Sequence, residues 1–460
     1  MIELTQTEPT YKPIPKEISY RPLGHYAEFK RGVLDSMIRL VDAYPDLVEV
    51  RVGPKKLVIL HHPELVREVL AKRGQEFPKA PVFRDTLGKA LGNGLVASGG
   101  KFHAKQRKMM QSLFHQKRMD AYSRVMVDYT ADMLKEWERN PKRDVHNDMM
   151  KLTMFIVSKT LFNADKATMA KDAQRAADAI ANNQIWMEKE FWLGIKLPSW
   201  IPTRGNLAYR RNNRVLREVL MPIIKRRQKE NGDRGDLLST LLAARDDQNR
   251  PMPLEQIFDE VNNLFSAGHE TTANSLTWAF YLLGQHPDVL AELTAEIDAV
   301  LQGSTPTIAD LDRLPYLEMV IKEAMRIYPA VWSLAYREVQ ADTTIGPYSF
   351  QKGTWLVVSP YSLHHQKAYY PNPKVFDPKR FDPGRAGSIP RYAYLPFGAG
   401  PRVCIGAQFA MLESQLILAT LLQQATFELV PGQVIKPKAL ITVSPENGLH
   451  IRVKRRQITT

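Results

Sequence analysis

The chain has 460 residues, of which 44% are hydrophobic and 24% are charged, and its formal net charge is +14. This composition is ordinary for a globular protein and excludes a disordered or fibrous chain, while length alone suggests two or three domains. The single cysteine excludes an internal disulfide, no apolar run reaches the length of a signal peptide or membrane span, and no nucleic-acid module is present, so we expect a cytoplasmic protein without a membrane anchor.

The first hundred residues alternate between extended and helical patterns. In chain order we expect a proline-rich extended lead-in, a helix, two strands of a small sheet and a second helix, at 1–25, 28–44, Val48–Val52, Lys56–Leu60 and 63–73. Residues 76–98 are rich in glycine and are expected to be irregular. A loop of that length is usually functional or disordered.

A helix that starts at about Lys101 carries two residues of chemical interest. His103 and Arg107 are four residues apart, which places them on one face of the helix. Lys101, Lys105 and Lys108 add positive charge to the same helix. Such a surface suits the docking of an acidic protein partner, and the alternative is an ordinary solvated surface.

Residues 120–245 are expected to be mostly helical. Amphipathic stretches occur at 122–137, 152–162, 169–182 and 207–228. The segment 185–202 is rich in Trp and Phe and is broken by prolines. It has two interpretations, either core packing between two helices or an apolar lid over a substrate entrance.

A long helix is expected to begin at Pro253, with apolar residues spaced three and four apart up to Phe265. The next positions on that face are Gly268 and Thr271. A glycine in the middle of a helix costs roughly 1 kcal/mol relative to alanine, so it needs a reason. Either a ligand lies against the helix there, or the glycine allows a local kink for packing. The hydroxyls of Thr271 and Thr272 can also bond to preceding carbonyls and bend the helix.

Further helices and short strands follow. We expect helices at 287–301 and 314–328, a second small sheet from 343–350 and 355–359, and final strands at 441–443 and 450–453. Glu323 and Arg326 are three residues apart on a helix and can form an ion pair. Exposed pairs of this kind contribute little to stability.

The loop Phe397–Gly406 reads FGAGPRVCIG and contains the only cysteine, Cys404. Its glycines permit unusual backbone geometry and the close approach of a flat ligand. A helix start follows the loop, and its unpaired N–H groups favour a thiolate over a thiol. A lone cysteine is, however, more often a small buried hydrophobic residue than a ligand.

The complete loop pattern decides between these interpretations. Phe397, Gly400, Arg402, Cys404 and Gly406 match F-x-x-G-x-R-x-C-x-G, the haem-binding loop of the cytochrome P450 family, which the chain resembles. Three other motifs occur in the order typical of that family: the arginine helix, A-G-x-E-T-T at 267–272, and E-x-x-R at 323–326 with P-x-R-F at 378–381.

The resemblance covers essentially the whole chain and therefore overrides the expectation of several domains. It implies a single cytochrome P450 domain over 1–460 that is mainly helical with small β-sheets. Haem would lie between the long central helix and the helix that follows the cysteine loop.

The resemblance makes Cys404 the axial thiolate ligand of the haem iron. The other cofactor-binding residues that it implies are His103, Arg107, Arg337, Phe397, Gly398, Arg402 and Gly406. Arg107, Arg337 and Arg402 would face the haem propionates, and Phe397 would pack beside the sulfur. His103 stands where tryptophan is commoner in the family.

Two further groups of residues follow from the resemblance. Thr271 would form a hydrogen bond to the dioxygen that is activated, and Glu270 would relay protons from solvent. Glu323, Arg326 and Arg380 would form a buried structural network rather than a catalytic one, because buried charges persist only when they are paired. In that network Lys379 replaces the usual glutamate of the family.

The function implied is an oxidoreductase, a haem-thiolate monooxygenase that inserts one oxygen atom from dioxygen into an apolar small molecule by hydroxylation or epoxidation. Haem b would carry the chemistry. Electrons would come from NAD(P)H through a ferredoxin or flavodoxin with its reductase, docked on the basic proximal surface of a monomer. The pocket candidates suit a fatty acid, a terpenoid or a polyketide-like molecule, and they are Trp186, Phe191, Trp192, Leu264, Ala267, Val331 and Trp332.

Two alternatives remain at this point. One is a haem-thiolate enzyme that uses peroxide or isomerises its substrate, and the intact Glu270–Thr271 pair argues against it because that pair serves dioxygen activation. The other is a non-enzymatic haem sensor or carrier, which would need neither a proton relay nor a substrate lid. Product formation that depends on electrons distinguishes both from a monooxygenase.

Overall fold

The computed structural model describes residues 12–193, 198, 200–230, 232–246, 248–334 and 336–456, without the side chains of residues 116, 117, 192 and 193. The chain divides into two compact units. The first unit holds the described residues up to Ala80 together with Ser333–Pro371 and Pro390–Val403, and the second holds Pro81–Trp332, Asn372–Ile389 and the residues from Cys404 onward. A single domain over 1–460 stays a prediction.

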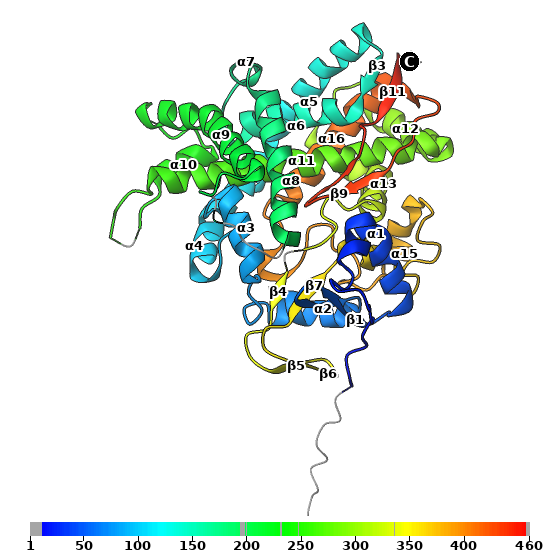
Figure 1. Ribbon diagram of the computed structural model, residues 1–460. Helices are drawn as coiled ribbons and strands as arrows, with labels where there is room; N and C mark the ends of the chain where they lie inside the picture. Colours follow the sequence, from blue (N-terminus) through cyan, green and yellow to red (C-terminus); the bar gives the residue numbers. More distant parts are fainter. Residues whose placement is uncertain are drawn as a thin grey trace, which may run out of the picture. The chain divides into compact units, whose positions relative to one another are not determined.

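The first unit is built on a sheet with the strand order β1-β2-β7-β4 (Figure 1). Its elements are α1 (Tyr26–Ala43), β1 (Leu47–Val52), β2 (Lys55–Leu60), α2 (Pro63–Arg67), the π-helical turn η1 (Glu68–Lys72), β4 (Arg337–Glu338), β5 (Thr343–Ile345), β6 (Tyr348–Phe350), β7 (Trp355–Val358), α14 (Pro360–His364) and the 3-10 turn η5 (Gly400–Arg402). The helix and the two strands expected before residue 61 are confirmed, and the second expected helix is formed by α2 and η1.

The strand β7 corrects one expectation. A second sheet was expected from 343–350 and 355–359, but only β5 and β6 form such a separate hairpin. β7 instead pairs in parallel with β2, from Leu57 opposite Trp355 to Leu60 opposite Val358. Every residue of β7 is buried, which is typical of parallel strands that are covered on both faces.

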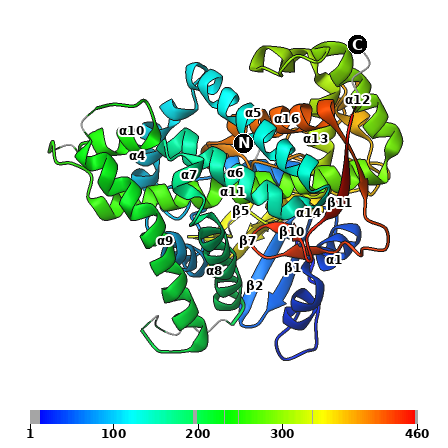
Figure 2. The same ribbon diagram turned by 90° about the horizontal axis from the view of Figure 1, so that it is seen from above.

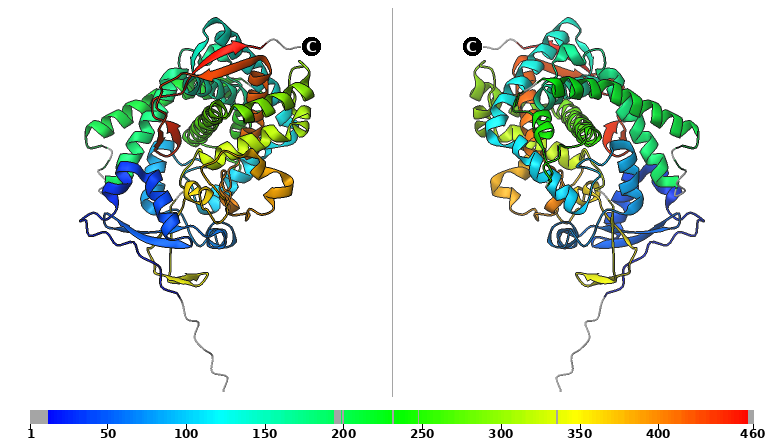
Figure 3. Two further views of the ribbon diagram at one scale, coloured as in Figure 1. Left: turned by 90° about the vertical axis from the view of Figure 1, so that its right-hand side faces the viewer. Right: turned by 90° about the vertical axis from the view of Figure 1, so that its left-hand side faces the viewer.

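The second unit is mainly helical, and α11 runs through the centre of its helices when viewed along its axis (Figure 3). Its helical elements are α3 (Pro81–Leu91), α4 (Gly100–Gln111), η2 (Ser112–Phe114), α5 (Gln116–Arg139), α6 (Val145–Phe162), α7 (Lys166–Met169), α8 (Ala173–Leu193), α9 (Arg204–Lys229), α10 (Leu237–Ala243), α11 (Leu254–Gln285), α12 (Pro287–Leu301), η3 (Ile308–Arg313), α13 (Pro315–Ile327), η4 (Pro378–Phe381), α15 (Pro383–Ala386) and α16 (Ala407–Gln424). The mainly helical fold class is confirmed.

Short antiparallel strands close this unit. Their bounds are β3 (Lys142–Asp144), β8 (Ala425–Leu429), β9 (Pro437–Ala439), β10 (Val443–Pro445) and β11 (His450–Arg455). β11 pairs with both β3 and β8, and β10 pairs with β9. Figure 2 shows these C-terminal strands in red and the helix α16, which precedes them in the chain, in orange.

The helix α3 is a second correction, because residues 76–98 were expected to be irregular. Proline is favourable in the first turn of a helix, and Pro81 opens this one. Its inner face buries Thr86, Leu87 and Ala90. Gly92, at a φ of +73°, follows its end. Within the described ranges, no helix combines the length and the apolar character needed to cross a membrane.

Candidate active site

Cys404 lies in the second unit, three residues before α16 begins. Its side chain is accessible, although protein atoms surround it densely. Burial raises the pKa of the Cys404 thiol above its ordinary value, while the N–H of Gly406 and the charge of Arg107 act in the opposite direction. The loop N–H therefore acts in the expected direction, but burial outweighs its effect on the pKa of the thiol, and the thiolate state stays a prediction. A coordinating metal ion deprotonates a thiol outright, so iron would supply what the loop does not.

The helix α4 carries the two residues expected to face a propionate. His103 is buried and Arg107 is half-buried, on the same face of the helix. Arg107 is close enough to Cys404 for its charge to act on the thiol. The structure therefore brings Arg107 and Cys404 together, while a role for His103 stays a prediction.

A small accessible area interrupts the buried centre of α11. Between Val261 and Phe280, a stretch that is fully described, only Ser266, Ala267, Gly268 and Thr271 are not buried. Ala267 is the most open of these, and the hydroxyl of Thr271 donates to the carbonyl oxygen of Ala267 at 2.8 Å. The predicted bond from a threonine hydroxyl to a preceding carbonyl is confirmed. A ligand could therefore contact α11 at Ala267 and Thr271.

The carboxyl group of Glu270 bonds to two residues outside α11. Oε2 of Glu270 accepts a hydrogen bond from Nε2 of Gln184 in α8 at 2.5 Å. Oε1 accepts one from the hydroxyl of Thr442 at 2.5 Å. The side chain is buried, and burial raises the pKa of the Glu270 carboxyl. The predicted catalytic acid is thus held between a helix and a C-terminal loop.

The first unit gathers three cations. Lys79 and Arg337 lie opposite each other on two extended segments, and Arg402 is near both. Burial and the charges of Arg402 and Arg337 lower the pKa of Lys79 to about 7. Burial and Arg402 lower the pKa of Arg337 to about 10. Nε of Arg337 is buried and has no hydrogen-bond partner among the described residues.

Close packing against η1 explains why residue 400 of the cysteine loop is a glycine. Its φ is +70°, and a Cβ there would lie 2.0 Å from the carbonyl oxygen of Leu70. Only glycine fits, because η1 passes directly against the loop. Gly398 also has a φ of +70°, and Phe397 is half-buried. Haem contacts of Phe397 and Gly398 stay predictions.

The haem implied by the sequence carries an iron, a flat apolar ring and two carboxylates, and the residues present fit it. The second unit offers the accessible thiol of Cys404 and the accessible surface at Ala267. The first unit offers Arg337, whose buried and unpartnered Nε suits a carboxylate acceptor.

The predicted substrate-pocket residues differ in their surroundings. Trp186 is buried and stacks on Tyr209 with ring centroids 4.2 Å apart, so it packs α8 against α9. Phe191 meets Phe83 of α3 edge to face. Trp186 also belongs to an apolar cluster with Leu87, Ala90, Ala97 and Met187, against which Ile441 packs.

The other pocket candidates are placed as follows. Leu264 is buried, Val331 is half-buried, and the side chain of Trp192 lies outside the described residues. Trp332 is buried, and its indole N–H donates to the carbonyl oxygen of Leu440 at 2.6 Å. Trp332 therefore fixes the C-terminal loop, and contact of any of these residues with substrate stays a prediction.

The structure brings the predicted ion network together in the second unit. Arg326 donates from Nε and Nη2 to the two carboxylate oxygens of Glu323, at 2.7 and 2.8 Å. Nε of Arg380 donates to Oε1 of Glu323 at 3.2 Å. Glu323 and Arg326 are both 0% exposed, so the geometry is that of a buried network.

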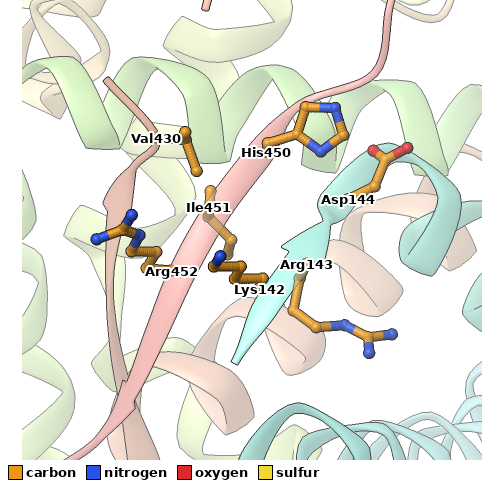
Figure 4. Close-up of a pocket in the computed structure, with 7 residues that line it drawn as sticks. All are labelled: Lys142, Arg143, Asp144, Val430, His450, Ile451 and Arg452. Carbon is orange, nitrogen blue, oxygen red and sulfur yellow. The ribbon is translucent and has the colours of Figure 1, made fainter. Parts of the chain in front are cut away.

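A surface pocket in the same unit contains none of the predicted site residues (Figure 4). It is formed around β3 and β11, and its lining residues are Lys142, Arg143, Asp144, Val430, His450, Ile451 and Arg452. Two of these are already engaged, because Asp144 caps α6 and Arg143 pairs with Asp148. We assign this pocket no part in the chemistry.

Sequence reasoning missed Lys79, Gln184 and Thr442. Lys79 lies between Pro78 and Pro81 and belongs to no recognisable motif. Gln184 and Thr442 are 86 and 172 residues from Glu270 along the chain. No local pattern in a single sequence could have connected these residues.

The chain is similar to known proteins over most of its length. A family model described as cytochrome P450 matches residues 16–452. Cyclooctat-9-en-7-ol 5-monooxygenase of Streptomyces melanosporofaciens is 38% identical over 90% of this chain and 89% of that protein. Pentalenene oxygenase of Streptomyces avermitilis is 34% identical over 94% of this chain and 95% of that protein. A crystal structure of the cytochrome P450DA heme domain has a TM-score of 0.86 and 27% identity, covering 97% of this chain and 99% of that one.

Proposed function

Because this chain belongs to the cytochrome P450 family, we propose that it is a monooxygenase whose substrate is a cyclic terpenoid. Family membership confirms the predicted haem cofactor and the predicted reaction class. The haem, when bound, supplies the activation of dioxygen that inserts one oxygen atom into an apolar substrate. The terpenoid is the part that is proposed.

The observation that carries the substrate class is the set of similar relatives. Two of them act, by name, on cyclooctat-9-en-7-ol and on pentalenene, and cyclooctatin synthase is 35% identical over 92% of this chain. All three names refer to cyclic terpenoids. The apolar cluster of Leu87, Ala90, Ala97, Trp186 and Met187 is buried core, so it supports the packing of α3 and α8 and not the choice of substrate.

The chain's own residues then divide the work. Cys404 would hold the iron, and Arg107, Arg337 and Arg402 would hold the carboxylates of the cofactor. The hydroxyl of Thr271, at the accessible part of α11, would orient the reacting oxygen. Glu270 supplies the proton that the reduction of oxygen to water consumes.

The titration of the ferric protein with candidate substrates tests the substrate class. Pentalenene and other cyclic terpenes are compared with a straight-chain fatty acid, and loss of the iron's water ligand is followed in the Soret band. We then expect product only when electrons are supplied, with one oxygen atom from labelled dioxygen. Binding and oxidation of the fatty acid, with no response to any cyclic terpene, would overturn the terpenoid proposal. Product formed without electrons would restore the peroxide-dependent or isomerising alternative.

Electron delivery is proposed to use the exposed lysines of α4. Lys101, Lys105 and Lys108 are exposed on the helix that carries Arg107, and an acidic ferredoxin or flavodoxin complements their charge. Charge reversal at Lys105 is expected to raise the KM for the partner at low salt and to leave substrate binding unchanged. The same rates with and without the reversal would count against this surface. We also propose that the protein is cytoplasmic, which cell fractionation tests. We further propose that it is a monomer, which light scattering tests.

A further inference from the structure

Glu270, Gln184 and Thr442 form a closed ring of side chains. Nε2 of Gln184 lies 2.5 Å from Oε2 of Glu270, and the hydroxyl oxygen of Thr442 lies 2.5 Å from Oε1 of Glu270. The same hydroxyl lies 3.3 Å from Oε1 of Gln184. All three side chains are buried, at 8%, 6% and 6% exposure. The three contacts therefore connect three residues into one loop of hydrogen bonds.

The number of donors in this ring favours a neutral acid. If Glu270 carries a proton on Oε1, that proton donates to Thr442, the hydroxyl of Thr442 donates to Oε1 of Gln184, and Nε2 of Gln184 donates back to Oε2 of Glu270. Each contact then has one donor and one acceptor. If Glu270 is charged, Thr442 must donate to it, and Oε1 of Gln184 receives nothing within the ring.

The surroundings provide no charge to stabilise a carboxylate. Gln184 and Thr442 are both uncharged, and burial is the largest influence on the pKa of Glu270, which it raises. The pKa values of other titratable groups on α11 and on the helices packed against it are also shifted so that the uncharged form is favoured. Burial lowers the pKa of His269 to about 4, lowers that of His146 in α6 and raises that of Glu413 in α16. Each of these shifts favours the uncharged form.

The loop that supplies Thr442 is fixed on both sides. The indole N–H of Trp332 donates to the carbonyl oxygen of Leu440 at 2.6 Å, and that of Trp278 donates to the carbonyl oxygen of Val443 at 2.9 Å. Ile441 packs on the apolar cluster of α3 and α8. The position of Thr442 is therefore set by packing and does not depend on Glu270.

We propose that Gln184 and Thr442 hold Glu270 as a neutral carboxylic acid and so keep one proton in reserve for the oxygen atom that leaves as water. This inference rests on the proposed function and deepens it. Gln184 and Thr442 are positioning residues, because they act through Glu270.

The proton balance is simple. When Glu270 gives up its proton, the O–H bond of the carboxyl breaks and the electron pair stays on the carboxylate. The hydroxyl of Thr442 then turns from Gln184 to Glu270, so that Thr442 and Gln184 each donate to one carboxylate oxygen. Both oxygens of the carboxylate then accept a hydrogen bond without movement of the heavy atoms, and one proton from solvent water restores the acid and the third contact of the ring.

Infrared difference spectroscopy of the purified haem protein, without substrate or reductant, tests the protonation state. At neutral pH we expect the C=O band of a protonated carboxyl, which moves in heavy water and is absent from Glu270→Gln. If the spectra of the wild type and Glu270→Gln show the same carboxyl bands, Glu270 is ionised in the wild type. This result would overturn the proposal.

The threonine variants test the ring itself. In Thr442→Val the acid loses the acceptor of its O–H, so its C=O band should move to a higher frequency, and Thr442→Ser should restore the wild-type band. Thr277→Val is the matched control, because Thr277 is a buried threonine of α11 whose hydroxyl donates to the carbonyl oxygen of Ala273 at 2.7 Å. An unchanged band in Thr442→Val, or the same shift in Thr277→Val, would contradict the ring.

Turnover provides a second readout. Thr442→Val and Gln184→Leu are expected to lower the product formed per electron pair by roughly tenfold and to move its pH profile, while Thr442→Ser stays close to wild type. Unchanged yield and pH profile in both variants would overturn the positioning role. Failure of the proposed function is separate: if no terpenoid is oxidised, the infrared bands still decide whether Glu270 is stored as the acid.

Discussion

Gly268 of α11 lies directly against Val157 of α6, where a Cβ on residue 268 would come within 2.9 Å of Cγ2 of Val157. Real Cβ atoms essentially never come so close, so the glycine permits these two helices to touch. Of the two reasons that the sequence offered for this mid-helix glycine, packing therefore has direct support. The accessible neighbour Ala267 faces another direction, because successive helical residues point about 100° apart.

The substitution Gly268→Ala is expected to destabilise the protein. Alanine gains about 1 kcal/mol in helix propensity, but the new methyl group overlaps Val157, and overpacking of this kind typically costs about 1–3 kcal/mol. Val157→Ala should relieve the clash, so that the double variant is more stable than the sum of the single effects predicts. Chemical denaturation of the four proteins measures this coupling. Additive effects would show that the helices do not meet at this point.

The substitution Glu323→Ala is expected to be severe, because it leaves Arg326 buried without its carboxylate. Removing one member of a buried ion pair typically costs about 3–5 kcal/mol. Glu318→Ala is the control on the same helix, where the exposed pair of Glu318 and Lys322 has an N–O distance of 2.7 Å. That change should cost less than about 1 kcal/mol. Similar losses of stability in the two variants would contradict a structural role for the network.

The substitution Cys404→Ser is expected to abolish normal haem binding, because the hydroxyl replaces the only thiol of the chain. The reduced protein exposed to carbon monoxide should lose the long-wavelength Soret band of thiolate-ligated haem. Gly406→Ala is a useful comparison, since a Cβ there would lie 3.8 Å from the ring of Phe114, an ordinary contact. A native thiolate spectrum in Cys404→Ser would show that another residue binds the iron.

Glu260 should make stability depend on pH. Its Oε2 accepts the backbone N–H of Leu95 at 2.8 Å, and burial raises the pKa of Glu260 to about 7 from an ordinary 4.5. The folded protein therefore binds more protons than the unfolded chain between these values. The contribution of Glu260 is fully present below pH 4.5 and is lost as the pH rises to about 7, with a change on the order of 3 kcal/mol.

The comparison of wild type with Glu260→Gln isolates this effect from other titrating groups. Glutamine has nearly the same shape and still accepts the N–H of Leu95, but it carries no charge at any pH. We expect the stability of Glu260→Gln relative to wild type to increase from acid to neutral pH. A constant difference over that range would mean that Glu260 titrates near its ordinary value.

Local patterns in the sequence predicted most of the helices, because the apolar spacing of α5, α9 and α11 follows directly from the face that each buries. The motifs were equally local, and Glu323 with Arg326 needs only one turn of helix. The partner Arg380 lies 57 residues from Glu323 and could be named only through a family resemblance. Periodicity by itself gave no reason to pair them.

Contacts between distant segments were beyond the reach of the sequence. The parallel pairing of β2 with β7 joins residues about 300 positions apart, and either strand alone fits several sheets. The raised pKa of the Cys404 thiol depends on how much protein surrounds the loop, which no spacing reveals. The helix α3 was missed because Gly88 and Gly92 read as loop residues, although a Cβ on Gly88 would meet open space.

Ile441 and Thr442 are consecutive. Ile441 packs on the apolar cluster of α3 and α8, whereas the hydroxyl of Thr442 bonds to Glu270. A longer loop could admit other substrates. It would also move the hydroxyl of Thr442 away from Glu270. Mutant libraries should therefore keep the loop length and vary residue 441 alone. Variants with a one-residue insertion would be expected to accept new molecules while wasting reducing equivalents as peroxide.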